Sequence, residues 1–291
     1  MPIKGLTENR RIPRIGKIHT GIKKRNAQGI EYPTAVDYFV FPPEWLERVR
    51  AVYSTDKPKS LPIIIPVEDE EKWANQYYRA YSRTRGLLCK GDGETANRLI
   101  DLKTGDMATH ESIAVEMRSV ECYGRDCPYY EAKKCRRVMM LQFMIPNLGN
   151  VGVWQLDTGS INAILNINGM AAMLQALYKR VSMIPLELVL APQTVKTPEG
   201  KQRTMPILKL RINATLQEAL SPGYTMLGLP AGEEAVEAPD EEYPEMIAPD
   251  AQAPSGAEPD PEFEEMLPID PERGKPEVKL PRRKSSGQAR I

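Results

Sequence analysis

The 291-residue sequence predicts an α+β fold, in which antiparallel strands and hairpins and a few helices surround a four-cysteine metal knuckle. Three observations lead to this class. The predicted strands and helices are segregated along the chain, whereas a parallel α/β sheet needs strict alternation. All four cysteines fall within residues 89–135. The C-terminal stretch is acidic and proline-rich, and it has too few apolar residues to form a core.

Charge divides the chain into three parts. From Pro230 onward there are 16 acidic and 7 basic residues, which leaves 32 basic and 23 acidic residues before that point. The sequence therefore predicts a basic N-terminal arm at 1–30, a metal-stabilised core at 31–228, and a disordered acidic tail at 229–291 with a basic end. A basic body joined to an acidic tail indicates nucleic acid or another charged partner.

The first elements are short. Residues 1–30 carry eight cations and one acid, with glycines and a proline between short extended pieces. The β-branched and aromatic run at 36–41 predicts a strand, which the following two prolines end. Apolar residues at helical spacing predict a helix over 43–53. The apolar run at 61–67, set between prolines, predicts a buried strand.

The middle of the chain is more polar. Residues 68–86 have acids in the first turn and cations in the last, which matches a helix dipole and predicts a helix. Trp73, Tyr77 and Tyr81 recur every four residues, as in the buried stripe of a helix. The Gly- and Asp-rich residues 90–111 predict a loop, and the alternation over 112–122 predicts a strand.

The last part of the core has the strongest local signals. Two apolar segments, 137–145 and 151–156, flank the turn sequence PNLGN and predict a hairpin. The nearly uncharged residues 160–181 predict a long helix, whose N-terminal cap comes from the preceding Asp, Thr and Ser residues. Two further strands flank KTPEGKQR, a turn sequence that predicts a second hairpin.

The cysteine pattern predicts a metal site, and it uses every cysteine in the chain: Cys89, Cys122, Cys127 and Cys135. Four thiolates complete a tetrahedral structural Zn²⁺ site and leave no position open for catalysis. Such a centre carries a charge of about −2, because every ligand is deprotonated. Nearby cations are expected to offset that charge: Lys90, Arg125, Lys133, Lys134, Arg136 and Arg137.

Other interpretations of the cysteines stay open at this point. An iron–sulfur cluster also takes four thiolates, and the cysteines could carry no ligand at all. His110 could replace one of them, although its place in a polar stretch is typical of a loop. The sequence has neither an N-terminal apolar segment typical of a secretory signal nor an apolar run of about 20 residues that would span a bilayer. We therefore expect a cytoplasmic protein without a membrane contact, where thiols stay reduced and clustered cysteines hold metal more often than they form disulfides.

Several stretches resemble the recombination directionality factor family of phages and prophages. They occur in the family's order over about residues 10–215: RIPRIGKIHTGIK, YPTAVDYFVFPPE, the cysteine set, VMMLQFMIPNLGNVGVWQLDTGS and LELVLAPQTVKTPEGKQRTMPILKL. The cysteine cluster followed by a strand, a Leu-Gly turn and QLDTGS is the most specific of these. The acidic tail lies outside the resemblance.

The resemblance implies a function. Members of the family are not enzymes; they bind a large serine integrase and switch it toward excision of the prophage, with DNA contacted through the integrase complex. The residues expected to touch the partner or nucleic acid are the basic ones of the arm and of the cysteine cluster: Arg10, Arg11, Arg14, Lys17, Lys23, Lys24, Lys133, Lys134, Arg136 and Arg137. The alternative is a nucleic-acid-binding recombination or replication protein, or a nuclease, with an iron–sulfur cluster.

Overall fold

The computed structural model describes residues 11–25, 31–82, 84–149, 151–196, 202–212, 217, 235–236 and 244–253. These residues form two compact units. Unit 1 takes its described residues from Met1–Tyr77 and Arg137–Pro268, and unit 2 takes its described residues from Tyr78–Arg136. The chain passes between the units within β5 (Ala74–Ser82) and β9 (Arg136–Phe143). Antiparallel sheets with few helices agree with the predicted α+β class.

The larger sheet of unit 1 is built around β2 (Arg14–Arg25). β2 pairs in parallel with β10 (Val153–Thr158) and antiparallel with β3 (Glu31–Val40). β10 also pairs antiparallel with β9, and η3 (Pro146–Leu148) lies at the turn between them. The first predicted hairpin is therefore confirmed.

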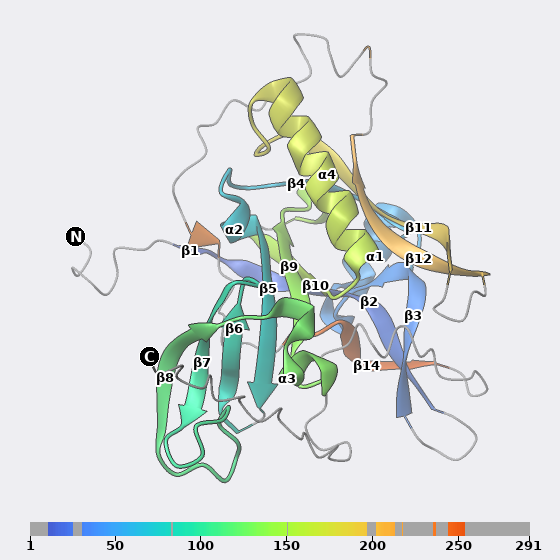
Figure 1. Cartoon of the computed structure of the whole chain (residues 1–291). Coiled ribbons are helices and arrows are strands. Elements are labelled where there is room, and N and C mark those ends of the chain that lie inside the picture. Colours follow the sequence, from blue (N-terminus) through green and yellow to red (C-terminus); the bar gives the residue numbers. More distant parts are fainter. Residues whose placement is uncertain are drawn as a thin grey trace, which may run out of the picture. The chain divides into compact units, whose positions relative to one another are not determined.

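The second sheet of unit 1 has the strand order β12-β11-β4. β4 (Ser60–Ile64) and β12 (Gln202–Arg211) both pair antiparallel with β11 (Pro185–Lys196), so the second predicted hairpin is confirmed. The long helix α4 (Ile161–Tyr178) packs against β12, as Figure 1 shows. None of the helices described in the structure is long and apolar enough to cross a membrane.

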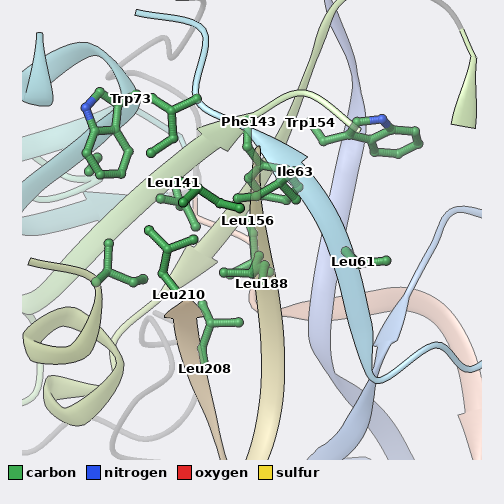
Figure 2. Packing of buried hydrophobic residues seen from close by; sticks show 14 of the residues in the cluster. Leu61, Ile63, Trp73, Leu141, Phe143, Trp154, Leu156, Leu188, Leu208 and Leu210 are labelled. Carbon is green, nitrogen blue, oxygen red and sulfur yellow. The ribbon is translucent and has the colours of Figure 1, made fainter. Parts of the chain in front are cut away.

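Buried apolar side chains from both sheets and from α4 make one continuous core in unit 1 (Figure 2). Ile63 of β4 and Phe143 of β9 lie together in it, and Leu188 and Leu210 enter from the β11–β12 hairpin. Strands supply such side chains on alternate positions, so a sheet with one buried face needs an apolar residue only at every second position. The short elements of unit 1 are β1 (Arg11–Ile12), η1 (Pro43–Trp45), α1 (Leu46–Tyr53), α2 (Glu70–Trp73), β13 (Ala235–Val236) and β14 (Ile247–Ala253).

Unit 2 is an antiparallel meander that starts with β5. It continues through β6 (Gly86–Gly91), β7 (Thr95–Asp101) and β8 (Val115–Glu121), each paired with the strand before it. Two one-turn helices follow, η2 (Gly124–Asp126) and α3 (Pro128–Glu131). The predicted strand at 112–122 is confirmed as β8.

The helix predicted over residues 68–86 is wrong after its first turn. α2 begins after Asp69, whose carboxylate accepts a hydrogen bond from the Glu71 N–H at 3.1 Å, and the chain then enters β5. The acidic residues that suggested a long helix belong to this one turn. Aromatic residues spaced by four share a face in a strand as well as in a helix, and here pairing with β6 decides the outcome.

The loop predicted over residues 90–111 is also wrong in part, because it contains β7. Asp92 turns the chain into this strand, since its carboxylate accepts hydrogen bonds from the N–H groups of Glu94 at 2.8 Å and Thr95 at 2.7 Å. Thr95 and Asn97 on one face of β7 are exposed, whereas Ala96 and Ile100 on the other face are buried. A strand that exposes one face carries many polar residues, and its composition then resembles that of a loop.

Residues 14–25, which were predicted to belong to a basic N-terminal arm, form strand β2. Ile18 and Ile22 are buried, and so are Lys17 and His19. This stretch has few apolar residues and several cations between them, so its composition did not predict a strand. The strand nevertheless pairs with β10 on one side and β3 on the other.

Part of the predicted disordered tail is ordered in the structure. β14 pairs in parallel with β2, and the preceding Met246 is buried beside Val138 and Met140. The Glu245 N–H donates to the Asp157 Oδ2 at 2.9 Å. Backbone pairing along an open strand edge does not depend on apolar composition, so composition alone predicted disorder here. The rest of the predicted tail lies outside the described residues, apart from β13.

Candidate metal centre

Unit 2 brings its four cysteines together from two places in the meander. Cys89 lies in the middle of β6, where its Cα partners are Ala80 in β5 and Arg98 in β7. The other three cysteines follow β8, before η2, between η2 and α3, and directly before β9. All four are buried. All four cysteines therefore belong to unit 2.

The four cysteines line one small cavity of about 10 Å³, which is room for a single water-sized sphere. None of them forms a disulfide. The remaining lining residues are Tyr78, Ala80, Arg98, Met107, Gly124 and Tyr129. The donor set of this cavity is thus four thiols, which is the set that closed zinc sites and iron–sulfur clusters use.

The structure does not show the expected metal knuckle among the residues that it describes. Within the described parts of the chain, no three His, Cys, Asp or Glu side chains have the arrangement of a formed metal site. The four thiols nonetheless converge, since the charge of each of the other three would act on Cys135. The residues thus fit a tetrathiolate site in donor type and number, and all four line the same cavity.

Burial raises the pKa of two of the thiols, those of Cys135 and Cys89. It raises the pKa of Cys135 far above the ordinary thiol value, and the neighbouring cysteines raise that pKa further. Burial also raises the pKa of Cys89, while a hydrogen bond from Arg98 acts in the opposite direction. Because a metal ligand must be a thiolate, an ion entering this cavity has to displace protons from these sulfurs.

Two glycines allow the backbone to approach the sulfurs. A Cβ placed on Gly91 would lie 2.8 Å from the Cys122 Sγ and 2.8 Å from the Ala96 Cβ, so no larger residue fits there. Gly124 has φ +53°, the left-handed region in which glycine has no steric penalty.

The cations expected to offset the charge of the centre do not line its cavity. Lys133 and Lys134 are exposed, and Arg125 is exposed as well. The guanidinium of Arg136 lies 5.9 Å from the centre of the Tyr130 ring, and Arg137 donates to the Gly159 carbonyl in unit 1. Neither these five residues nor Lys90 line the cavity.

Arg98 is the cation that does line it, and sequence reasoning missed it. Its guanidinium lies 4.9 Å from the centre of the Tyr129 ring and within hydrogen-bonding reach of the Cys89 sulfur. Reading residues 95–101 as a strand paired with β6 would have placed Arg98 opposite Cys89. The loop prediction for this segment removed that signal.

Two of the basic residues predicted as partner contacts, Arg14 and Lys17, are paired within unit 1. The Arg14 Nη1 donates to the Gln155 Oε1 at 3.0 Å, and the buried Lys17 Nζ lies 3.9 Å from the Asp157 Oδ2. Lys23 is exposed and Lys24 is half-buried, both on β2. Arg10 lies outside the described residues, and Arg11 is described only as part of β1.

His110 does not join the cysteines. Its side chain is 63% exposed and its Nε2 lies 3.4 Å from the Glu111 Oε1. The other histidine, His19, belongs to unit 1, where its Nε2 lies 3.6 Å from the Glu245 Oε2. The candidate centre is therefore made of cysteines alone.

Comparison with known families gives one match. The family model described as Gp3-like, recombination directionality factor-like, matches residues 15–213. This span covers more than half of the chain, including all four cysteines and Arg98, and it ends before β13 and β14. No curated protein and no solved structure matches the chain significantly.

Proposed function

Because the chain belongs to the recombination directionality factor-like family, whose model it matches over residues 15–213, we propose that it binds a serine integrase and favours prophage excision. The family implies an integrase partner. The family match is the observation that carries the proposal, since it spans β2 to β12 and includes all the described residues of unit 2. DNA would be contacted through the integrase complex.

Such a factor needs no chemistry of its own. It changes the outcome by binding one arrangement of the integrase–DNA complex better than another, and a difference of about 3 kcal/mol gives a bias of over 100-fold. We propose a non-enzymatic role on this basis. A rigid folded surface is sufficient for it, and the two units offer such surfaces.

We further propose that Cys89, Cys122, Cys127 and Cys135 hold one structural Zn²⁺ in unit 2. The four buried thiols that share one cavity support this. The cavity has room for one water-sized sphere, which favours a single ion over the larger iron–sulfur cluster. When bound, zinc would supply no reaction chemistry; it would cross-link β6 to the segment after β8.

Recombination with purified components tests the functional proposal. The integrase encoded in the same genetic element is given either the site pair used for integration or the pair that flanks the prophage, with and without this protein. When the protein is added, we expect recombination of the flanking pair to appear and recombination of the integration pair to fall. An integrase that neither binds the protein nor changes its choice of sites would refute it.

The same protein sample separates the metal alternatives. A colourless protein with zinc bound supports the structural site, whereas absorption in the visible range with bound iron supports a cluster. A nuclease or single-strand-binding role would additionally require that the protein cut or bind DNA without integrase.

A further inference from the structure

Arg98 has an unusual position for a charged residue. It lies on β7 with Cys89 as its Cα partner on β6, and residues directly opposite in an antiparallel pair place their side chains on the same face of the sheet. The side chain thus enters the cavity that the four cysteines line. Among neutral thiols, this half-buried guanidinium has no full negative charge to pair with, so its partial burial there is costly unless something supplies one.

Neighbouring residues hold this guanidinium in one orientation. It stacks over the Tyr129 ring at 4.9 Å. The Tyr129 hydroxyl is itself fixed, because it accepts a hydrogen bond from the Met107 N–H at 3.0 Å. The planar face of Arg98 is thereby held by an aromatic ring, and its edge carries the donors that are directed at the cavity.

One of these donors has no acceptor. The Nε of Arg98 is buried and makes no hydrogen bond with any part of the chain that the structure describes. A buried N–H without a partner costs about 1–3 kcal/mol. Thiolate sulfurs of a metal centre would supply both the missing acceptors and the missing negative charge.

We propose that Arg98 is the counter-charge of the metal–thiolate centre, a positioning residue that donates hydrogen bonds to the ligand sulfur of Cys89 and neutralises part of the centre's charge. This inference rests on the proposed zinc site. It assigns the charge compensation to one half-buried residue of a neighbouring strand and not to the cations expected from the sequence. Residues that orient metal ligands in this way typically change metal affinity 10–100-fold when they are removed.

Arg118 offers a matched control in the same sheet. It is the Cα partner of Arg98 on the other side, in β8. Its guanidinium pairs at the surface with Glu116, with Nη2 and Oε2 2.6 Å apart, and it does not line the cavity. Removing Arg118 therefore takes the same charge from the same sheet without touching the sulfurs.

The test compares zinc binding by the full-length wild type, Arg98→Met, Arg98→Lys and Arg118→Met. Zinc dissociation constants are measured by competition with a chromogenic chelator, together with the rate at which each protein loses zinc. We expect Arg98→Met to weaken binding about 10–100-fold and to speed zinc loss. The zinc affinity of Arg98→Lys, which keeps the charge but loses the planar donors, should lie between those of Arg98→Met and the wild type. The zinc affinity of Arg118→Met should match that of the wild type.

Melting of the metal-free and zinc-loaded forms distinguishes a counter-charge from an ordinary packing role. A counter-charge lowers the melting temperature of the loaded Arg98→Met protein relative to wild type and leaves the metal-free form unchanged or more stable. Equal destabilisation of both forms, or unchanged zinc affinity in both Arg98 variants, would overturn the inference. A wild type that binds no zinc would instead refute the metal site itself, so the two failures are distinguishable.

Discussion

The two units bury very different side chains. Unit 1 closes over a continuous apolar core drawn from both of its sheets and from α4. In the described part of unit 2, the main buried cluster has seven residues, and three of them are cysteines. A core this small rarely stabilises a fold without disulfides or metal. Unit 1 thus has an extensive apolar core to stabilise it, whereas the proposed zinc site would supply the cross-link that the small core of unit 2 lacks.

Removal of the metal should give the largest difference between the units. We expect a zinc chelator, or Cys127→Ser, to destabilise unit 2 and leave the stability of unit 1 unchanged, because structural zinc contributes about 10 kcal/mol or more in small domains. Hydrogen exchange measured by peptide should show loss of protection in β6, β7 and β8 but not in β10 or β11.

Returning zinc to the chelated wild type serves as the control and should restore protection, while Cys127→Ser should stay unprotected. Retention of full protection in unit 2 after complete removal of metal would show that its core is sufficient without an ion.

A cavity in the unit 1 core should produce the reverse pattern. Leu141 is 1% exposed within the apolar core, and Leu141→Ala should cost about 2–5 kcal/mol of unit 1 stability. Chemical denaturation reports this loss, and zinc content should stay at the wild-type level. Release of zinc by this variant would mean that the two units do not depend on separate sources of stability.

High pH should destabilise only the metal-free form of unit 2. Burial raises the pKa of Cys89 and Cys135, so these thiols keep their protons in the folded state while the unfolded chain releases them from about pH 9. Stability of the metal-free form is therefore constant below about pH 9 and falls above it, by up to about 1.4 kcal/mol per pH unit per thiol.

Denaturation curves measured between pH 7 and 10.5 test this dependence. The zinc-loaded protein is the control. Its thiols are already deprotonated, so the stability of its unit 2 should not fall above about pH 9. A metal-free unit 2 that gains stability above pH 9 would contradict the assigned burial of the thiols.

The smallest predicted effect is at the start of α4 in unit 1. The Ser160 Oγ accepts a hydrogen bond from the Ala163 N–H at 3.4 Å. Ser160→Ala should cost about 1 kcal/mol of unit 1 stability, as expected for the loss of an N-cap, whereas Ser160→Thr should retain most of it. Thermal melts should resolve the two variants, and an equal loss in both would assign the effect to packing and not to capping.

The contrast between the two units also explains which parts of the structure could be predicted from the sequence. In unit 1 the hairpins of β9–β10 and β11–β12 and the helix α4 were predicted, because their apolar spacing and turn residues are local signals. β2 and β14 were missed as strands of the sheet. Their pairing joins distant parts of the chain, and their charged residues hide it.

In unit 2 the four cysteines were predicted to gather, since their number and spacing have a chemical meaning of their own. The strands that position them were not predicted. Trp73, Tyr77 and Tyr81 suit a helix and a strand equally well, and the polar composition of β7 resembles a loop. Arg98 could not be found without the β6–β7 register, which places it opposite Cys89.

Metal and thiol analysis of the freshly purified, reduced full-length protein tests the central claim most directly. We predict one zinc per chain, with the four thiols unreactive toward a thiol reagent until a chelator removes the ion and unit 2 loses its protection. A protein without metal, whose unit 2 stays protected from hydrogen exchange, would contradict it.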